Sequence, residues 1–182
     1  MTQGFSRTGS DRLVIRLDSV EKSILQSLTD QIIAFVQPND PDPDRDPLAA
    51  LVGIDDAAQI SEDPALARLF PDAYRDDPEA ADDFRRFTER QLREGKLANA
   101  TTVKDALTRS GNKVTISLEQ ASAWLGFLND VRLALGSRIG ISEENHEELA
   151  DLPDEDPRSG MFEIYDWLTY LQESLVQALM PA

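Results

Sequence analysis

The sequence predicts a mainly α-helical (α+β) domain, a helical bundle with a small antiparallel sheet made of an N-terminal hairpin and a strand near 113–117. Two observations carry this prediction. Long segments place apolar residues three and four positions apart, which aligns them on one face of a helix. The short segments "RLVIRL" and "KVTIS" alternate apolar and polar residues, as half-buried strands do. At 182 residues, we expect the whole chain, 1–182, to form a single domain.

The first expected element is the hairpin, in which residues 4–7 and 12–17 flank the turn "TGSD". A helix should follow, because Asp18 and Glu21 have the spacing of an acidic capping box. Pro38 should end this helix at about Val36. Its apolar stripe is expected to consist of Leu17, Val20, Ile24, Leu28, Ile32 and Phe35.

Residues 37–47 read "QPNDPDPDRDP" and are expected to form a linker rich in proline and aspartate. Its carboxylate spacing superficially resembles a calcium loop. The glycine and the terminal glutamate of such a loop are absent, so we predict no metal site there. Short helices are expected at 47–53 and 64–70, the second capped by Asp63 with Pro64 at its first position.

A long helix is expected from Pro78, with Asp77 as its N-cap. Gly95 lies midway along this helix and predicts either a break or a close helix contact, because glycine is unfavourable inside a helix. The apolar face of the helix is expected to consist of Phe84, Phe87, Leu92, Val103, Ala106 and Leu107.

The strand at 113–117 should lead into a helix that Ser117 and Gln120 start with a second capping box. We expect this helix to stop at Gly136 and to be followed by an acidic loop near 142–160, with one helical turn within the loop as an alternative. The last helix should begin near the end of that loop. Its apolar stripe is Met161, Ile164, Tyr165, Leu168, Leu171, Leu175 and Leu179.

The protein is acidic, with a net charge of −16 that is unevenly distributed. Residues 39–83 hold fourteen acidic and three basic side chains, and residues 143–156 hold eight acidic and no basic ones. Such a field disfavours direct binding to nucleic acid or to anionic membranes, although a local basic patch stays compatible with it. Without a secretory or transmembrane segment, we expect a cytoplasmic protein. Without cysteine, disulfides, thiolate catalysis and thiolate metal sites are excluded.

One candidate site is an arginine stripe in "FRRFTERQLREGKL", where Arg86, Arg90 and Arg93 follow i, i+4, i+7 spacing. The simpler interpretation is a neutralised surface, on which the arginines pair with the acidic segment just before them. The alternative is a partner-binding stripe that contacts an acidic protein or a phosphate backbone.

A second candidate is the polar insertion of Asp130 and Arg132 into the apolar run of 126–140. We interpret it as a structural ion-pair network with partners on neighbouring helices, because a lone buried charge is strongly destabilising. The alternative is a carboxylate tuned for acid–base chemistry, which would need a nucleophile or a second carboxylate nearby. His146 lies among glutamates without a second histidine, so we predict a solvated face and no metal ligand there. We predict no catalytic residue and no cofactor, since the common nucleotide, zinc and hydrolase motifs are absent.

Three long segments carry a family resemblance: "DPALARLFPDAYRDDPEAADDFRRFTERQLREGKLANA", "WLGFLNDVRLALGSRIGI" and "YDWLTYLQESLVQAL". They resemble an actinobacterial family, long labelled a domain of unknown function, of oxidative-stress-sensing regulators called AosR. The resemblance implies a transcription-linked regulator that cooperates with a stress sigma factor. Redox-sensing members close a disulfide between two cysteines, and that thiol switch cannot operate here. We therefore predict a non-enzymatic protein that binds a protein partner, with a small enzyme using carboxylates in a cleft as the alternative.

Overall fold

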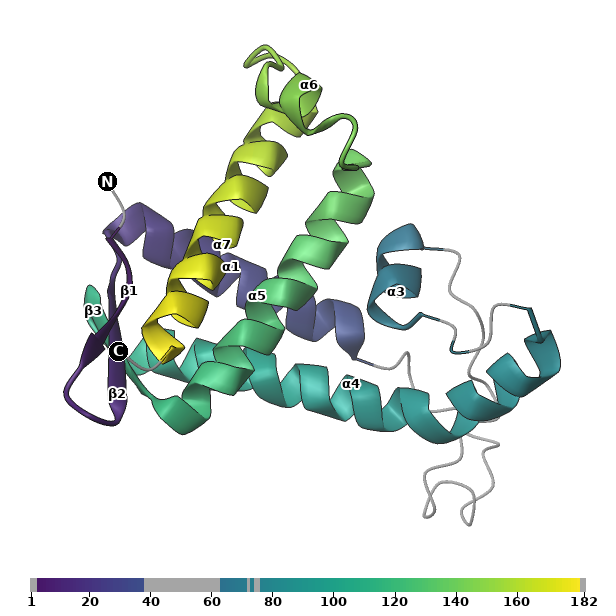
Figure 1. The fold of residues 1–182 in the computed structure, drawn as a ribbon, viewed down its shortest axis with the longest axis horizontal. Coiled ribbons are helices and arrows are strands. Elements are labelled where there is room, and N and C mark those ends of the chain that lie inside the picture. The colour runs from purple at the N-terminus through teal and green to yellow at the C-terminus, as the bar shows by residue number, and fades with distance from the viewer. Residues whose placement is uncertain (1–2, 38–62, 72, 74–75, 181–182) are drawn as a thin grey trace.

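The chain starts with a small antiparallel sheet at one end of the molecule (Figure 1). In the computed structural model the described residues are 3–37, 63–71, 73 and 76–180. The strands lie side by side in the order β1 (Gln3–Thr8), β2 (Arg12–Arg16) and β3 (Lys113–Ser117). The register pairs Leu13 with Ile116 and Ile15 with Val114, and all four side chains are buried. The predicted hairpin, third strand and fold class are confirmed.

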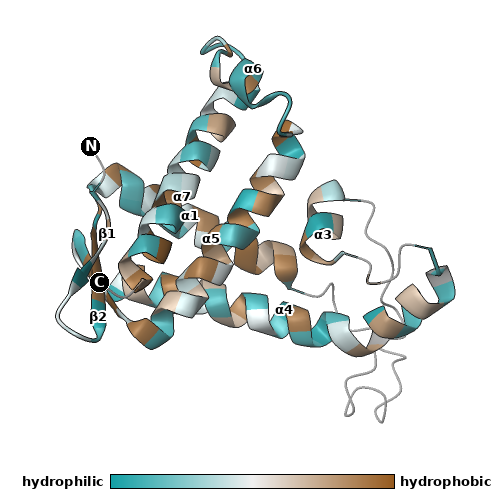
Figure 2. Cartoon of the chain, viewed as in Figure 1, coloured by the Kyte–Doolittle hydropathy of each residue, from teal (hydrophilic) through white to brown (hydrophobic). Residues whose placement is uncertain are grey.

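The helices pack into a bundle beside this sheet. Figure 1 shows α5 and α7 side by side, leading away from the sheet to α6, while α4 crosses below them. Apolar residues concentrate where α1, α4, α5 and α7 meet (Figure 2). The helices are α1 (Ser19–Val36), α3 (Pro64–Leu69), α4 (Pro78–Arg109), α5 (Leu118–Ile139), α6 (His146–Ala150) and α7 (Pro157–Leu179).

Short sequence signals start most of these helices. The Asp18 carboxylate accepts hydrogen bonds from the backbone of Val20 and Glu21, and the Glu21 carboxylate accepts one from the Asp18 backbone at 2.8 Å. Ser117 and Gln120 form the second capping box. The aspartates predicted to cap α3 and α4 also accept a backbone hydrogen bond in front of a proline. The predicted helix starts at Asp18, Asp63, Asp77 and Ser117 are confirmed.

The segment near 142–160 contains the helical turn considered as an alternative, but the last helix begins inside this segment, earlier than predicted. It contains the short helix α6, and its last residues already belong to α7, which begins at Pro157. Asp156 caps α7 and is followed directly by proline. The same aspartate–proline pair predicted the starts of α3 and α4. The aspartate–proline signal for a helix start was therefore present at Asp156 too, but the acidic composition of the segment predicted a loop.

Part of the predicted organisation lies outside the described residues. This holds for the helix expected at 47–53 and for the linker at 37–47 apart from Gln37. Gln37 itself ends α1, and its backbone N–H donates to the carbonyl of Ile33. In the described part of the chain, no helix is long and apolar enough to cross a membrane.

The core is centred on α5 and reaches the sheet through aromatic contacts. Trp124 and Phe127 have no exposed surface, and the ring of Trp124 meets that of Phe5 edge-on at 5.4 Å. Helix α7 covers β1 from another direction. The backbone N–H of Phe5 donates to Ser174 Oγ at 2.9 Å, and that of Gly4 donates to the Tyr170 hydroxyl at 3.0 Å. These bonds use strand donors that would otherwise lie open at a sheet edge.

Two predictions about glycines are wrong. Helix α5 does not stop at Gly136 but continues to Ile139, after which Gly140 adopts the left-handed conformation of a helix cap, with φ +67°. A Cβ at Gly136 would lie 2.9 Å from Ile141 Cγ2 and 3.3 Å from Tyr165 Cε2. The missing side chain therefore lets neighbouring segments approach the helix and does not end it.

Helix α4 runs unbroken through Gly95, where a Cβ would meet no neighbouring group within 4 Å. We expect Gly136→Ala to lower the free energy of unfolding by about 1–3 kcal/mol, because its neighbours must move apart. We expect Gly95→Ala to raise it by about 0.5–1 kcal/mol, because alanine favours the helix and meets no obstacle. Urea denaturation of both variants measures these changes, and equal effects of the two substitutions would contradict the explanation.

Candidate functional site

The first half of α4 has charged residues facing inward and aromatic residues facing solvent. Arg85 and Glu89 are 7% and 8% exposed, whereas Phe84 and Phe87 are 44% and 61% exposed. Leu92 is also exposed. The apolar face predicted for this helix is therefore correct only in its second half, where Val103 and Leu107 are fully buried.

Helical spacing explains this difference. Stepping back from Leu107 by three or four residues at a time reaches first the apolar Val103 and Ala100 and then the charged Lys96, Arg93, Glu89 and Arg85. Phe84 and Phe87 lie on a different side of the same helix. The continuous inward face of α4 thus changes from apolar to charged along its length.

Two inward charges of α4, Glu89 and Arg93, pair with each other, and Arg93 also contacts neighbouring segments. Glu89 Oε1 accepts hydrogen bonds from Arg93 Nε at 2.8 Å and from Arg93 Nη2 at 2.5 Å. Arg93 Nη1 donates to the backbone carbonyl of Val36 at 3.0 Å, and the guanidinium lies 4.4 Å from the centre of the Phe70 ring. Arg93 therefore links the end of α1, the residue after α3 and the middle of α4.

The structure separates the residues of the predicted arginine stripe. Arg93 lies between helices and is 21% exposed, whereas Arg90 is 44% exposed and pairs with Glu94 at 2.9 Å. The side chain of Arg86 lies outside the described residues. Partner binding by the stripe stays a prediction, and Arg90 is the described member that an incoming protein could reach.

Asp130 lies at the contact between α4 and α5. Its carboxylate accepts a hydrogen bond from Lys96 Nζ at 2.6 Å, and its side chain is 5% exposed. Burial raises the pKa of Asp130 above its ordinary value of 3.8, while the hydrogen bond and charge of Lys96 act in the opposite direction. Sequence spacing alone did not identify Lys96 as the partner of Asp130.

Arg132 points away from Asp130 and toward α7. Its Nε donates to Thr169 Oγ1 at 2.8 Å, its Nη1 to Gln172 Oε1 at 2.6 Å and its Nη2 to the Tyr165 hydroxyl at 3.3 Å. The guanidinium also lies 5.1 Å from the centre of the Tyr165 ring. Asp130 and Arg132 thus join α5 to two different helices, each through its own partners.

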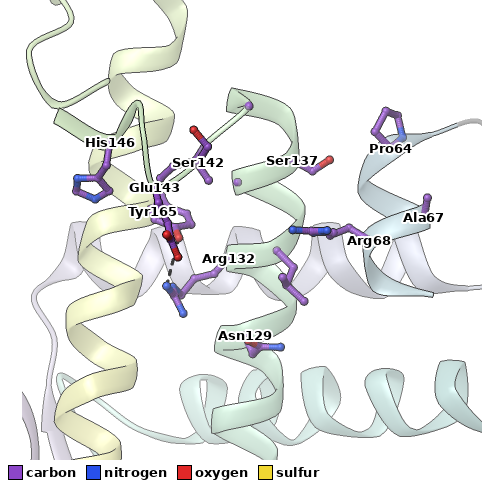
Figure 3. Close-up of a pocket in the computed structure, with 14 residues that line it drawn as sticks. Pro64, Ala67, Arg68, Asn129, Arg132, Ser137, Ser142, Glu143, His146 and Tyr165 are labelled. Atoms are coloured by element: carbon purple, nitrogen blue, oxygen red, sulfur yellow. Dashed lines mark hydrogen bonds between the residues drawn. The ribbon is translucent and has the colours of Figure 1, made fainter. Parts of the chain in front are cut away.

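A groove of about 1080 Å³ lies beside Arg132, bordered by α3, α5, α7 and the segment that joins α5 to α6 (Figure 3). The polar side chains that line it include Arg68, Arg132, Glu143, His146 and Tyr165. Asp130 is not among the lining residues, so the carboxylate considered from the sequence for acid–base chemistry lies elsewhere. No short motif in the sequence indicated this groove, because its residues come from separate elements.

The groove contains one described carboxylate, that of Glu143, and one histidine. The His146 ring packs edge-on against Phe162 at 5.1 Å. Among the residues that the structure describes, no three histidine, aspartate or glutamate side chains converge as a metal site would require. The chemistry that the groove offers is therefore mainly cationic and hydrogen-bonding.

The chain is similar to several curated proteins. It is 34% identical over 174 residues to the oxidative stress regulator AosR of Mycobacterium tuberculosis (strain ATCC 25618 / H37Rv), covering 88% of this chain and 78% of that protein. It is 33% identical over 174 residues to the putative oxidative stress regulator AosR of Mycobacterium leprae (strain TN), covering 88% and 79%. No solved structure matches the chain significantly. The family model described as "Domain of unknown function (DUF2017)" matches residues 2–179, and the chain belongs to that family.

Proposed function

We propose that this protein is a regulator of the oxidative stress response that acts by binding a partner protein and not by catalysis. The regulatory part of the proposal draws on the relatives, which are named oxidative stress regulators. The proposed partner is a stress sigma factor, as the family resemblance implies. Since the sequence has no cysteine, regulation here would not depend on a disulfide.

The observation that carries this proposal is the exposed apolar surface on the first half of α4. Of the seven large apolar side chains that are exposed among the described residues, three lie on this stretch of helix. Two of them, Phe84 and Phe87, are three positions apart and so adjacent on the helix, and exposed apolar patches are typical of interaction sites. The three residues are Phe84, Phe87 and Leu92.

Charge complements this apolar surface. Arg90 follows Phe87 by three residues, so the two lie next to each other on the helix, and both are exposed. Aromatic and arginine side chains are enriched in protein interfaces. The combination favours a partner that presents apolar side chains beside acidic ones.

The position of Asp130 supports binding over catalysis. A general base must be able to reach a substrate proton. The Asp130 carboxylate is buried between α4 and α5 and held by Lys96, and it does not line the groove beside α5. A structural role in holding two helices together accounts for its burial and its partner.

We expect Phe87→Ser and Arg90→Glu each to weaken binding of a purified stress sigma factor from the native host by about tenfold or more, because central interface aromatics and arginines dominate binding energy. Isothermal titration calorimetry against a panel of such factors measures this. Arg93 is left unchanged, because its substitution would disturb the contacts between helices.

Matched controls are Val20→Ser, which changes a similarly exposed apolar residue on α1, and Arg109→Glu, which reverses a charge at the far end of α4. Circular dichroism checks that all four variants are folded. The proposal is supported if only the Phe87 and Arg90 variants lose affinity. It is overturned if no stress sigma factor binds the wild type, or if all four variants bind equally well.

A further inference from the structure

Arg132 differs from the inward-facing cations Arg93 and Lys96 of α4. Arg93 is paired with the carboxylate of Glu89, and Lys96 is paired with that of Asp130. Arg132 is half-buried, yet its hydrogen-bond acceptors are a hydroxyl, an amide oxygen and a phenol, all of them neutral. No carboxylate of the described residues lies within ion-pair distance of it. Its positive charge is therefore uncompensated at short range.

Arg132 lines the groove and has more N–H groups than its bonds to α7 use. A guanidinium carries one N–H on Nε and two on each terminal nitrogen. Each nitrogen of Arg132 makes one hydrogen bond to α7, so Nη1 and Nη2 each retain one donor without a described acceptor. These unused N–H groups can donate to the oxygens of a carboxylate or phosphate, the anions that arginine binds most strongly. The bonds to α7 also hold the guanidinium in place before any ligand arrives.

The rest of the groove adds a second cation and an apolar wall. Arg68 enters from α3 and is without a described ion-pair partner (Figure 3). Leu133 and Ile141 also line the groove, and Gly136 contributes a surface without a side chain. Glu143 is the opposing charge, and it lies exposed at the groove. The net effect is a cationic, partly apolar groove on a protein whose overall charge is strongly negative.

We propose that this groove binds a small organic anion, whose carboxylate or phosphate pairs with Arg132 and whose apolar part lies against Leu133 and Ile141. Arg68 strengthens the binding by its charge, and Glu143 weakens it. The site is distinct from the exposed surface of α4 that is proposed to bind a partner, and it requires no partner protein for its test.

The test is an NMR titration of the ¹⁵N-labelled protein with benzoate, phenyl phosphate and the neutral analogue benzamide. Benzoate and phenyl phosphate should produce saturable shifts at Arg132 Nε–H and at the backbone amides of Gly136, Ile141 and Tyr165. Benzamide should not, because it lacks the negative charge. The tighter of the two anions identifies whether carboxylate or phosphate is preferred. Equal shifts with benzamide, or no shifts with either anion, would overturn the proposal.

Four variants test the roles of the charges. Arg132→Gln should weaken benzoate binding by about tenfold or more, because it removes the group that pairs with the anion. Arg68→Gln should weaken it by about two- to threefold, because Arg68 attracts the anion by its charge and does not pair with it directly. Glu143→Gln should strengthen binding by about two- to threefold, because it removes the opposing charge. Arg109→Gln, on a distant exposed ion pair, is the control and should have no effect.

Arg132→Gln also removes contacts between α5 and α7 and could unfold the protein. The opposite effects of the exposed residues Arg68 and Glu143 keep the test decisive in that case. Wild-type affinity in both of these variants would then overturn the proposal, as would wild-type affinity in a folded Arg132→Gln protein.

Discussion

Replacing Lys96 by methionine should lower the free energy of unfolding by about 3–5 kcal/mol at pH 7, because it leaves a buried carboxylate without its partner. The Asp130 side chain is 5% exposed, and among the described residues its one ion-pair partner is Lys96, at 2.6 Å. Methionine keeps the length and apolar stem of lysine, so the loss reports on the charge and not on packing. Chemical denaturation monitored by tryptophan fluorescence measures it.

The free energy of unfolding lost in Lys96→Met should become smaller as the pH falls, because the buried Asp130 takes up a proton and no longer needs a cation. Burial raises this pKa above 3.8, so the folded protein binds the proton more tightly than the unfolded chain. The contribution of Asp130 to stability is therefore largest below pH 3.8 and decreases as the pH rises through the folded pKa. The hydrogen bond and the positive charge of Lys96 both lower the pKa of Asp130, so removing Lys96 raises this pKa further. The destabilisation by Lys96→Met should thus be fully developed only above that raised pKa.

Two further proteins complete this test. The double variant Lys96→Met, Asp130→Leu should recover most of the lost stability, because apolar residues of similar size can replace a buried ion pair. Lys104→Met removes an exposed pair with Asp30, also 2.6 Å long, and should cost less than about 1 kcal/mol. A double variant as unstable as Lys96→Met, or a loss in Lys96→Met no larger than in Lys104→Met, would refute the role assigned to this pair.

Replacing Arg93 by alanine should lower the free energy of unfolding by about 2–4 kcal/mol, since several partners lose contacts at once. Glu89 is 8% exposed and loses its bidentate cation, the Val36 carbonyl loses a donor and the Phe70 ring loses the guanidinium above it. Thermal and urea denaturation measure the change.

Arg109→Ala is the matched control for Arg93→Ala. It also breaks an i, i+4 arginine–carboxylate pair on α4, but both side chains are more than half exposed, and the cost should stay within about 0.5 kcal/mol. Similar losses in the two variants would mean that Arg93 does not link α1, α3 and α4 as described.

Local signals in the sequence were sufficient for most elements of the fold. Capping residues and alternation predicted the hairpin, the third strand and four helix starts, because these depend on residues within a few positions of one another. The charged inward face of α4 was also readable, by stepping back from Leu107 at helical spacing. It was missed because Phe84 and Phe87 were assumed to face inward.

It was harder to predict which apolar residues of a helix are buried against the neighbouring helices. Val20 belongs to the predicted stripe of α1 but is 65% exposed, whereas Leu25, outside that stripe, is fully buried. Spacing along a helix defines possible faces, and the neighbouring helices decide which of them is covered. For α1 the covered face is the one against α4.

The sequence by itself therefore determined the class of fold, the starts of α1, α3, α4 and α5 and the exclusion of thiol chemistry. Only the tertiary structure decided that Asp130 pairs with Lys96 and that Arg93 connects α4 to the end of α1 and to Phe70 after α3. It also decided that Arg132 borders a groove and has more N–H groups than its bonds to α7 use. Lys96 and Asp130 lie 34 residues apart in the chain, Arg132 and Thr169 lie 37 apart, and Arg93 and Val36 lie 57 apart. A side chain's charge balance depends on groups that folding brings to it, and these cannot be deduced from its neighbours in sequence.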